Sequence, residues 1–171
     1  MTIVDDDFSA GLLGFTQSAA NVDENVLSGS ITLTVTRSGG VYGLITVQYA
    51  SANGPAVAGT NAATAGSDYT AVNGTLSWVD GDGTSKSIIV PIIDDSVVEG
   101  PENFSVTLSN PTGGAVLDST KSNIVVTIND NDSSLQFSQA IYVVGEDQPF
   151  VTVTVQRSGG PLGALSVQLY T

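Results

Sequence analysis

The sequence predicts an all-β fold: a seven-stranded antiparallel immunoglobulin-like β-sandwich, followed by a partial second copy of the same unit. Two observations lead to this prediction. Apolar and polar residues alternate with a period of two in one segment after another, and no segment has the period of a helix. Turn residues separate these segments at regular intervals, as in sandwiches built from short strands.

Each expected strand has its own alternation. In "SITLTVTR", Ile31, Leu33 and Val35 share one face and threonines occupy the other. Pro91 interrupts a later strand pattern and predicts an edge position or a bulge there, because proline has no N–H to donate. The seven expected strands are 15–22, 30–37, 44–50, 75–79, 86–93, 103–109 and 123–129.

Clusters of small and turn-forming residues connect these strands. The segment 51–68, "SANGPAVAGTNAATAGSD", has no strand period and predicts a long loop between the third and fourth strands. Shorter turns are expected at 38–40, 73–74, 80–83 and 110–114.

An internal repeat divides the chain. Residues 15–50 and 137–171 share F-x-Q, an acidic pair after a valine, a strand ending in Arg-Ser-Gly-Gly, and a second alternating strand. "TIVDDD" at 2–7 resembles "TINDND" at 127–132, which gives a period of about 120 to 125 residues. We interpret the chain as a slice of a tandem array, with a short natural protein carrying an unusual tail as the alternative. The expected parts are 1–8, the tail of a preceding repeat; 9–132, a complete domain; and 133–171, the first strands of a following, incomplete repeat.

Composition restricts the function classes. Seventeen acidic residues against four basic ones give a formal charge of −13, which disfavours nucleic acid and anionic membranes as partners and favours cations. The chain has no Cys and no His, so thiolate and imidazole sites for transition metals are excluded. Oxygen ligands remain, and they suit Ca²⁺ or Mg²⁺. No apolar run is long enough to predict membrane insertion.

The acidic residues gather at strand ends that can meet at one pole of a sandwich. Like charges about 4 Å apart repel by about 4 kcal/mol per pair near a protein surface, so carboxylates without basic partners protonate or bind cations. Ca²⁺ accepts about six to eight oxygens in loose geometry, so two or more Ca²⁺ ions are predicted, with Mg²⁺ as second choice. For Asp80, Asp82 and Asp118 we expect only solvated turns. The converging carboxylates are Glu24, Asp68, Asp94, Asp95, Glu99, Glu102, Asp130 and Asp132.

Several segments in order, "VDEN", "VTRSGG", "VQYASANG", "AGSDYT", "IIDDSVVEGPENF" and "VTINDND", resemble the Calx-beta domain across 14–132. The tail, 133–171, resembles the first three strands of another copy. The resemblance implies a sandwich that binds several Ca²⁺ ions at one pole through the same eight carboxylates, with the Val97 carbonyl as a backbone ligand. Asn131 stands where a third acid is often seen and Ser96 is neutral, so both lower the ligand charge. The partial copy keeps only Glu146 and Asp147 near its pole and should not form a complete site alone.

The leading functional hypothesis is a calcium-binding structural or adhesion module of a large tandem-repeat extracellular protein, such as a secreted bacterial one. Calcium next to Asp132 would stiffen the junction with the following repeat. The expected partners are adjacent repeats, including head-to-tail self-assembly. The alternative is a calcium sensor that changes conformation for a partner. An enzyme is not expected, because paired carboxylates alone lack the aromatic cleft of a glycosidase and Trp78 fits the core.

Overall fold

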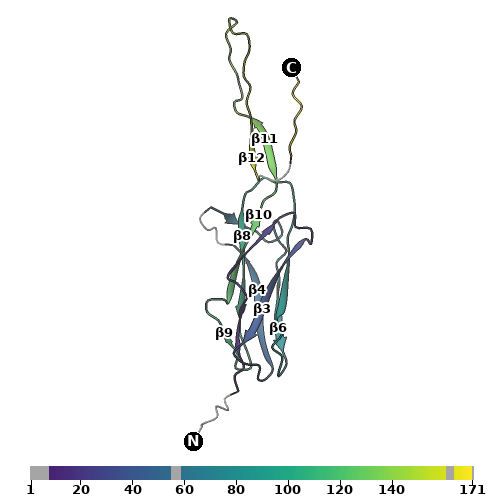
Figure 1. Cartoon of the computed structure of the whole chain (residues 1–171), viewed down its shortest axis with the longest axis vertical. Helices are drawn as coiled ribbons and strands as arrows, with labels where there is room; N and C mark the ends of the chain where they lie inside the picture. Colours follow the sequence, from purple (N-terminus) through teal and green to yellow (C-terminus); the bar gives the residue numbers. More distant parts are fainter. Residues whose placement is uncertain (1–7, 55–58, 161–163, 171) are drawn as a thin grey trace.

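The computed structural model describes residues 8–54, 59–160 and 164–170, in which the chain forms twelve strands and no helix. These ranges therefore hold no helix capable of crossing a membrane. Two sheets stack as a sandwich, and a separate two-stranded ribbon projects beyond one end of it (Figure 1). The predicted all-β sandwich is confirmed.

The first sheet has four strands in the order β7-β3-β1-β9. β7 lies at its edge and ends at Pro91, in agreement with the edge position that the proline predicts. β3 and β7 pair antiparallel from Ser30 opposite Pro91 to Val35 opposite Lys86. The strands are β1 (Leu12–Phe15), β3 (Ser30–Ser38), β7 (Lys86–Pro91) and β9 (Val116–Leu117).

The second sheet has the order β2-β10-β8-β4-β6, with a short β5 beside β8. β10 and β8 are antiparallel, whereas β2 runs parallel to β10. β2 and β10 therefore finish, and β8 begins, at the same end of the sheet. The strands are β2 (Ala19–Asp23), β4 (Ile45–Asn53), β5 (Asn61–Ala62), β6 (Asn73–Trp78), β8 (Glu102–Ser109) and β10 (Asn123–Asn129).

The first expected strand, 15–22, is two strands in the structure. β1 pairs with β3 in the first sheet, and β2 then pairs with β10 in the second. The chain therefore crosses between the sheets at 16–18, a manoeuvre known from the corners of sandwiches. It also introduces parallel pairs, β1 with β9 and β2 with β10, into a mostly antiparallel fold.

The core lies between the two sheets and consists of the alternating apolar residues. Trp78 is fully buried, as predicted, and its indole Nε1 donates a hydrogen bond to the Thr84 carbonyl at 2.6 Å. The rings of Tyr69 and Phe104 stack with centroids 4.3 Å apart. Burial of each such side chain contributes about 2 to 3 kcal/mol, so these aromatic rings are a large part of the stability.

The prediction of an irregular loop for 51–68 is partly wrong. β4 continues to Asn53, which lies opposite Phe104 of β8, and β5 then takes the next place along β8, with Asn61 opposite Glu102. Residues 55–58 lie outside the described residues. A strand of two residues, Asn61 and Ala62, is too short to show an alternation, so the sequence pattern does not predict it.

The ribbon beyond the sandwich pairs β11 (Ser133–Phe137) with β12 (Val155–Gly159). Leu135 lies opposite Arg157, just as Leu13 lies opposite Arg37 between β1 and β3. The ribbon thus repeats the strand pairing and register of the first unit. Of the expected preceding repeat, residues 1–7 lie outside the described residues, and Phe8 stacks on Tyr42 at 4.8 Å.

Arg37 organises the pole of the sandwich farther from Pro91. Its side chain is buried, and among the described residues its guanidinium donates to backbone carbonyls of three separate segments. This use of the planar fork explains the Arg in the Arg-Ser-Gly-Gly motif. The acceptors are the carbonyls of Ala10 (2.9 Å), Tyr42 (2.8 Å), Gly43 (3.3 Å), Val79 (3.4 Å) and Asp82 (3.0 Å).

Arg37→Lys should lower the free energy of unfolding by about 3 kcal/mol, because one ammonium cannot pair all of these carbonyls. Urea denaturation of the whole chain measures this change. Arg157 has the matching register position in the ribbon and donates to Ser133 Oγ and to the Gly160 carbonyl, but these contacts are exposed to solvent, so Arg157→Lys should change the same quantity by less than about 1 kcal/mol. Equal losses in the two variants would contradict the role given to the buried fork.

Candidate metal centre

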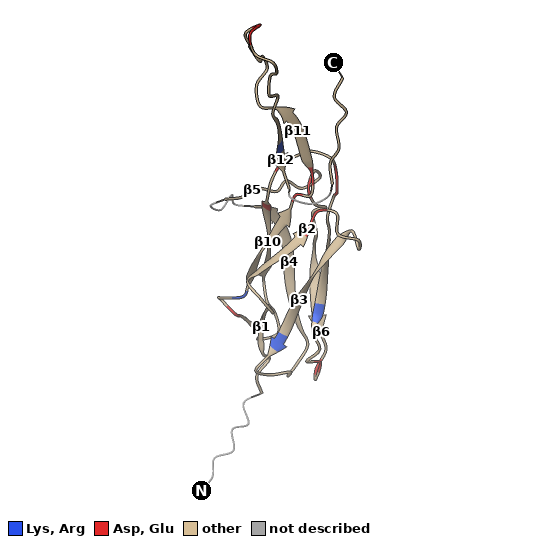
Figure 2. Cartoon of the chain, turned by 45° about the horizontal axis from the view of Figure 1, so that its top comes forward, with Lys and Arg blue, Asp and Glu red and all other residues tan. Residues whose placement is uncertain are grey.

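The carboxylates that the sequence predicts to converge lie at the end of the sandwich facing β11 and β12. Figure 2 shows several acidic segments, in red, between the sandwich and the ribbon, besides others at separate turns and at the tip beyond the ribbon. Glu24 follows β2, Asp130 follows β10 and Glu102 is the first residue of β8. These three positions lie at the same end of the second sheet. The loop from β7 to β8 brings Asp95 and Glu99 from the first sheet to the same pole.

Glu24, Asp95 and Asp132 form a first cluster, in which one carboxylate oxygen from each lies within 4.8 Å of the other two. Glu24 is only 7% exposed and accepts a hydrogen bond from the Asp95 N–H at 3.3 Å. Its pKa is raised from 4.5 to about 7, mainly by burial; the hydrogen bond from the Asp95 N–H lowers the pKa, and the negative charges of Asp95, Asp130 and Asp132 contribute to the net rise. Burial and neighbouring acids also raise the pKa of Asp132.

Asp68, Glu99 and Glu102 form a second cluster with the same 4.8 Å spacing. The Oδ2 atom of Asp68 accepts a hydrogen bond from the Thr64 N–H at 2.5 Å, and this contact fixes the direction of a carboxylate that is 8% exposed. Burial, followed by a hydrogen bond with Asp68 and the negative charge of Asp68, raises the pKa of Glu102 from 4.5 to about 7. Burial followed by the charge of Asp68 raises the pKa of Glu99.

Asp130 connects the two clusters. Its Oδ2 accepts hydrogen bonds from the N–H groups of Glu99 and Gly100, both at 3.0 Å, and its Oδ1 accepts one from the Asp132 N–H at 2.7 Å. These bonds hold the β7–β8 loop against the chain that leaves β10. Between the clusters is a cavity of about 10 Å³, roughly the room of one water-sized atom. Its acidic lining residues are Glu24, Asp68, Glu99, Glu102 and Asp130.

Two of the predicted ligands lie at the margin of the clusters. Asp94 is exposed, and its charge is among those that raise the pKa of Asp132. Val97 is also exposed, and its N–H donates a hydrogen bond to Asp95 Oδ1 at 2.7 Å. Neither belongs to the two three-residue clusters found among the described residues.

Two buried oxygens at this pole have no hydrogen-bond partner among the described residues: Asp132 Oδ2 and Asn131 Oδ1. A buried unpaired oxygen is costly in free energy, and a cation is a suitable partner for it. The clusters, the small cavity and these oxygens fit Ca²⁺, which takes oxygen ligands in variable geometry. The sequence suggested only that Asn131 lowers the ligand charge; its position between two predicted ligands was the available signal for a buried oxygen.

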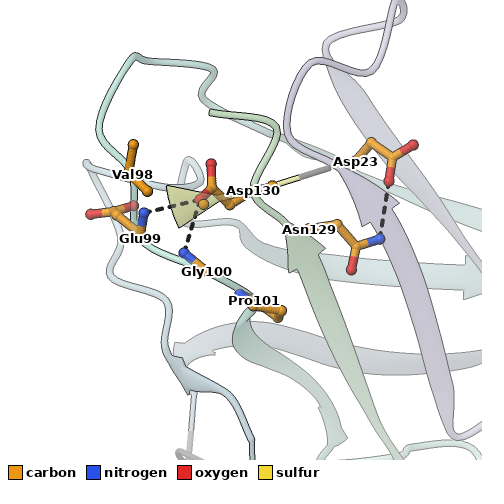
Figure 3. A pocket seen from close by; sticks show the side chains of 9 residues that line it. Asp23, Val98, Glu99, Gly100, Pro101, Asn129 and Asp130 are labelled. Carbon is orange, nitrogen blue, oxygen red and sulfur yellow. Dashed lines mark hydrogen bonds between the residues drawn. The ribbon is translucent and has the colours of Figure 1, made fainter. Parts of the chain in front are cut away.

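A larger pocket of about 660 Å³ opens beside the clusters, where the sandwich meets the end of β12 (Figure 3). Asp130 lies at its rim with hydrogen bonds to the β7–β8 loop, and Asn129 Nδ2 donates to Asp23 Oδ1 at 3.0 Å. Val98 and Pro101 supply apolar lining. Gly159, at the end of β12, and the following Gly160 complete it, so this pocket lies where the sandwich meets the ribbon.

The acids expected to be ordinary turn residues make local contacts away from this pole. Asp82 pairs with Lys86 at 2.9 Å and accepts hydrogen bonds from Thr84, and these contacts, led by Lys86, lower its pKa. Asp118 accepts hydrogen bonds from Thr120. Asp80 accepts one from the Gly43 N–H at 2.7 Å.

The model of the Calx-beta domain family matches residues 5–132 and again residues 129–171. The chain belongs to the Calx-beta family. Calx-beta domains are calcium-binding modules of extracellular matrix proteins and exchangers. The resemblance stated from the sequence motifs is therefore confirmed.

The Calx-beta chain is similar to parts of much longer proteins. It is 29% identical over 160 residues to extracellular matrix organizing protein FRAS1 of Mus musculus, covering 94% of this chain and 4% of that protein. It is 30% identical over 162 residues to adhesion G-protein coupled receptor V1 of Danio rerio, covering 92% and 2%. It is 30% identical over 162 residues to sodium/calcium exchanger 1 of Rattus norvegicus, covering 84% and 16%.

Solved structures of Calx-beta domains share the fold. The apo form of the Calx CBD1 domain superposes with a TM-score of 0.62 at 29% identity, covering 71% of this chain and 97% of that one. The calcium binding domain CBD12 of CALX1.1 gives a TM-score of 0.62 at 27% identity, covering 80% and 53%.

Proposed function

We propose that residues 9–132 bind two or more Ca²⁺ ions at the acidic pole, and that these ions stiffen the junction with the following repeat of a large extracellular protein. The role is structural or adhesive, and it is binding rather than catalysis. The proposed ligands are Glu24, Asp68, Asp94, Asp95, Glu99, Glu102, Asp130 and Asp132, with the Val97 carbonyl.

The observation that carries the proposal is the pair of carboxylate clusters, each with its oxygens within 4.8 Å. The ion pair that the structure describes, between Lys86 and Asp82, is at the other end of β7 and does not neutralise them. Without cations, burial and mutual repulsion raise the pKa values of Glu24 and Glu102 to about 7. Two sets of three carboxylates favour at least two ions, because one Ca²⁺ does not use six carboxylates efficiently.

A role at the junction is supported by Asp132, which contacts both the sandwich and the ribbon. Its carboxylate belongs to the first cluster, while its carbonyl accepts a hydrogen bond from the Gly160 N–H of the ribbon at 2.7 Å. Gly159 lies so close to Val98 that a Cβ there would approach the valine Cγ1 to 2.6 Å. An ion that fixes Asp132 and the β7–β8 loop would therefore also fix the contact with the next unit.

The proposed partners are adjacent repeats of the same protein, either along one chain or head to tail between chains. Support comes from the second family match at 129–171 and from the apolar side chains that this part exposes, among them Phe137, Phe150 and Val167. A two-stranded ribbon is marginally stable alone and needs further strands to bury such residues. An extracellular location agrees with the matrix and membrane relatives.

Calorimetric titration of the whole chain with Ca²⁺ tests the binding. We expect at least two ions per chain and release of protons near neutral pH, since Glu24 and Glu102 must ionise to bind. Mg²⁺ should compete weakly, because it requires a stricter octahedron. Absence of heat and of proton release on adding Ca²⁺ would overturn the proposal.

A calcium sensor is the alternative, supported by the similarity to an exchanger. NMR relaxation distinguishes the two roles. For a brace, amides of β11 and β12 tumble with the sandwich in calcium and independently in chelator, while chemical shifts within the sandwich core stay nearly constant. For a sensor, the core strands themselves shift on binding.

A further inference from the structure

Asn103 is a buried polar residue to which the calcium-binding proposal gives no role. It follows Glu102 in β8, and its side chain is 0% exposed. Its Nδ2 donates to Thr60 Oγ1 at 2.5 Å, and its Oδ1 accepts from Thr127 Oγ1 at 2.7 Å. One amide thus connects β10 to the segment that precedes β5.

The backbone of Asn103 holds the same segment. Its carbonyl accepts a hydrogen bond from the Ala63 N–H at 2.8 Å. Gly54 lies across this carbonyl so closely that any side chain there would collide, since a Cβ would approach the oxygen to 1.6 Å. Gly54 thus packs against the Asn103 carbonyl, and Ala63 hydrogen-bonds to it. We call the contacts of Asn103 with Thr60 and Ala63 the Asn103 tether.

The Asn103 tether leads directly to the second cluster. Ala63 precedes Thr64, whose N–H orients the Asp68 carboxylate at 2.5 Å. The backbone of Asp68 is held as well. Its N–H donates a hydrogen bond to the Thr64 carbonyl, and its carbonyl accepts one from the Ile93 N–H, both at 3.0 Å. At its other end the tether adjoins Glu102, which lies opposite Asn61 of β5. Asp68 and Glu102, which meet in the second cluster, are thus both positioned by residues next to the Asn103 tether.

We infer that Asn103 is a positioning residue for the second cluster: through Thr60 and Ala63 it sets Asp68 against Glu102, and so it controls the affinity of the ion held there. The first cluster, built on Glu24, Asp95 and Asp132, contains neither of these two carboxylates, and it shares with the second cluster only the Asp130 contacts described above, so it should respond much less to the Asn103 tether. This inference rests on the proposed calcium binding and identifies an uncharged residue that regulates one of the two ions.

A matched pair of variants tests the inference. Thr60→Val and Thr127→Val each remove one hydroxyl partner of Asn103, but only Thr60 belongs to the tethered segment. In calcium titrations of the whole chain, Thr60→Val should weaken one binding step by about fivefold, the effect of one hydrogen bond, while Thr127→Val stays within about twofold of wild type. Thr60→Ser, which keeps the hydroxyl, should restore the affinity. Glu102→Gln identifies the affected step, because it removes a carboxylate of the second cluster itself.

Amide hydrogen exchange in calcium-free buffer gives a second readout. The Thr64 N–H should exchange faster in Thr60→Val and remain at its wild-type rate in Thr127→Val. If the wild type binds no calcium, the proposed function fails and takes this inference with it. If the wild type binds and Thr60→Val binds equally well, or if both valine variants weaken binding alike, the inference alone is overturned.

Discussion

Raising the pH from 5 to 8 without calcium should lower the free energy of unfolding by about 3 kcal/mol. Burial and neighbouring carboxylates raise the pKa of Glu24 from 4.5 to about 7. The folded protein therefore keeps a proton between these values that the unfolded chain has released, so stability falls as pH rises through this window. Glu102, whose pKa is also raised to about 7, acts in the same direction.

Acids elsewhere do not cancel this effect. The pKa values of Asp82 and Asp118 are lowered by hydrogen bonds, chiefly from Lys86 and Thr120 respectively. Their stabilising contribution is lost only as the pH falls below about 4, outside the window in question.

Calcium should reverse the dependence. At about one hundred times the dissociation constant, each ion adds about 2.7 kcal/mol, so two ions add about 5 kcal/mol and raise the melting temperature by roughly 15 °C. The gain should be greatest at pH 8 and small at pH 5, where protonated glutamates compete with the ion. Urea unfolding across this pH range, in calcium-stripped and calcium-containing buffers, measures both effects. Stability that rises with pH in both buffers would contradict the raised pKa values.

The strand pattern was predictable because alternation records which face of a strand is buried. Leu33 and Val35 in β3 and the buried Trp78 at the end of β6 illustrate this relation. The crossing of the opening segment from one sheet to the other was not predictable. β1 and β2 have four and five residues, so neither is long enough to show a separate alternation. β5 and β9, with two residues each, carry no periodic signal at all.

The location of the candidate site was predicted from two signals together: the acids have no basic neighbours, and they fall at strand ends that can meet at one pole of a sandwich. Which acids come together in one cluster could not be predicted, since Asp95 and Asp68 reach different clusters through loops with no regular pattern. Uncharged participants were also hidden. In the sequence, nothing distinguishes Asn103 from the solvent-exposed asparagines of the chain. The role inferred for it depends on its burial and on its contact with Thr60, which only the folded structure shows.

Glu24→Gln should stabilise the calcium-free protein and weaken the calcium-bound one. At pH 8 without calcium the substitution removes a buried charge from beside Asp95 and Asp132, which should raise the free energy of unfolding by about 2 kcal/mol and flatten its pH dependence. The glutamine retains an oxygen for the Asp95 N–H, so the local fold should persist. With calcium, loss of a first-cluster ligand should remove about 3 kcal/mol of the stabilisation, the contribution of one ion.

The opposite signs make this variant more informative than a simple loss of stability. Glu146→Gln is the matched control. It makes the same change in charge, at an exposed residue in the segment between β11 and β12. It should alter neither curve measurably. If Glu24→Gln destabilises the calcium-free protein, the Glu24 carboxylate stabilises the fold even without a cation. Repulsion among these acids would then not be what calcium relieves.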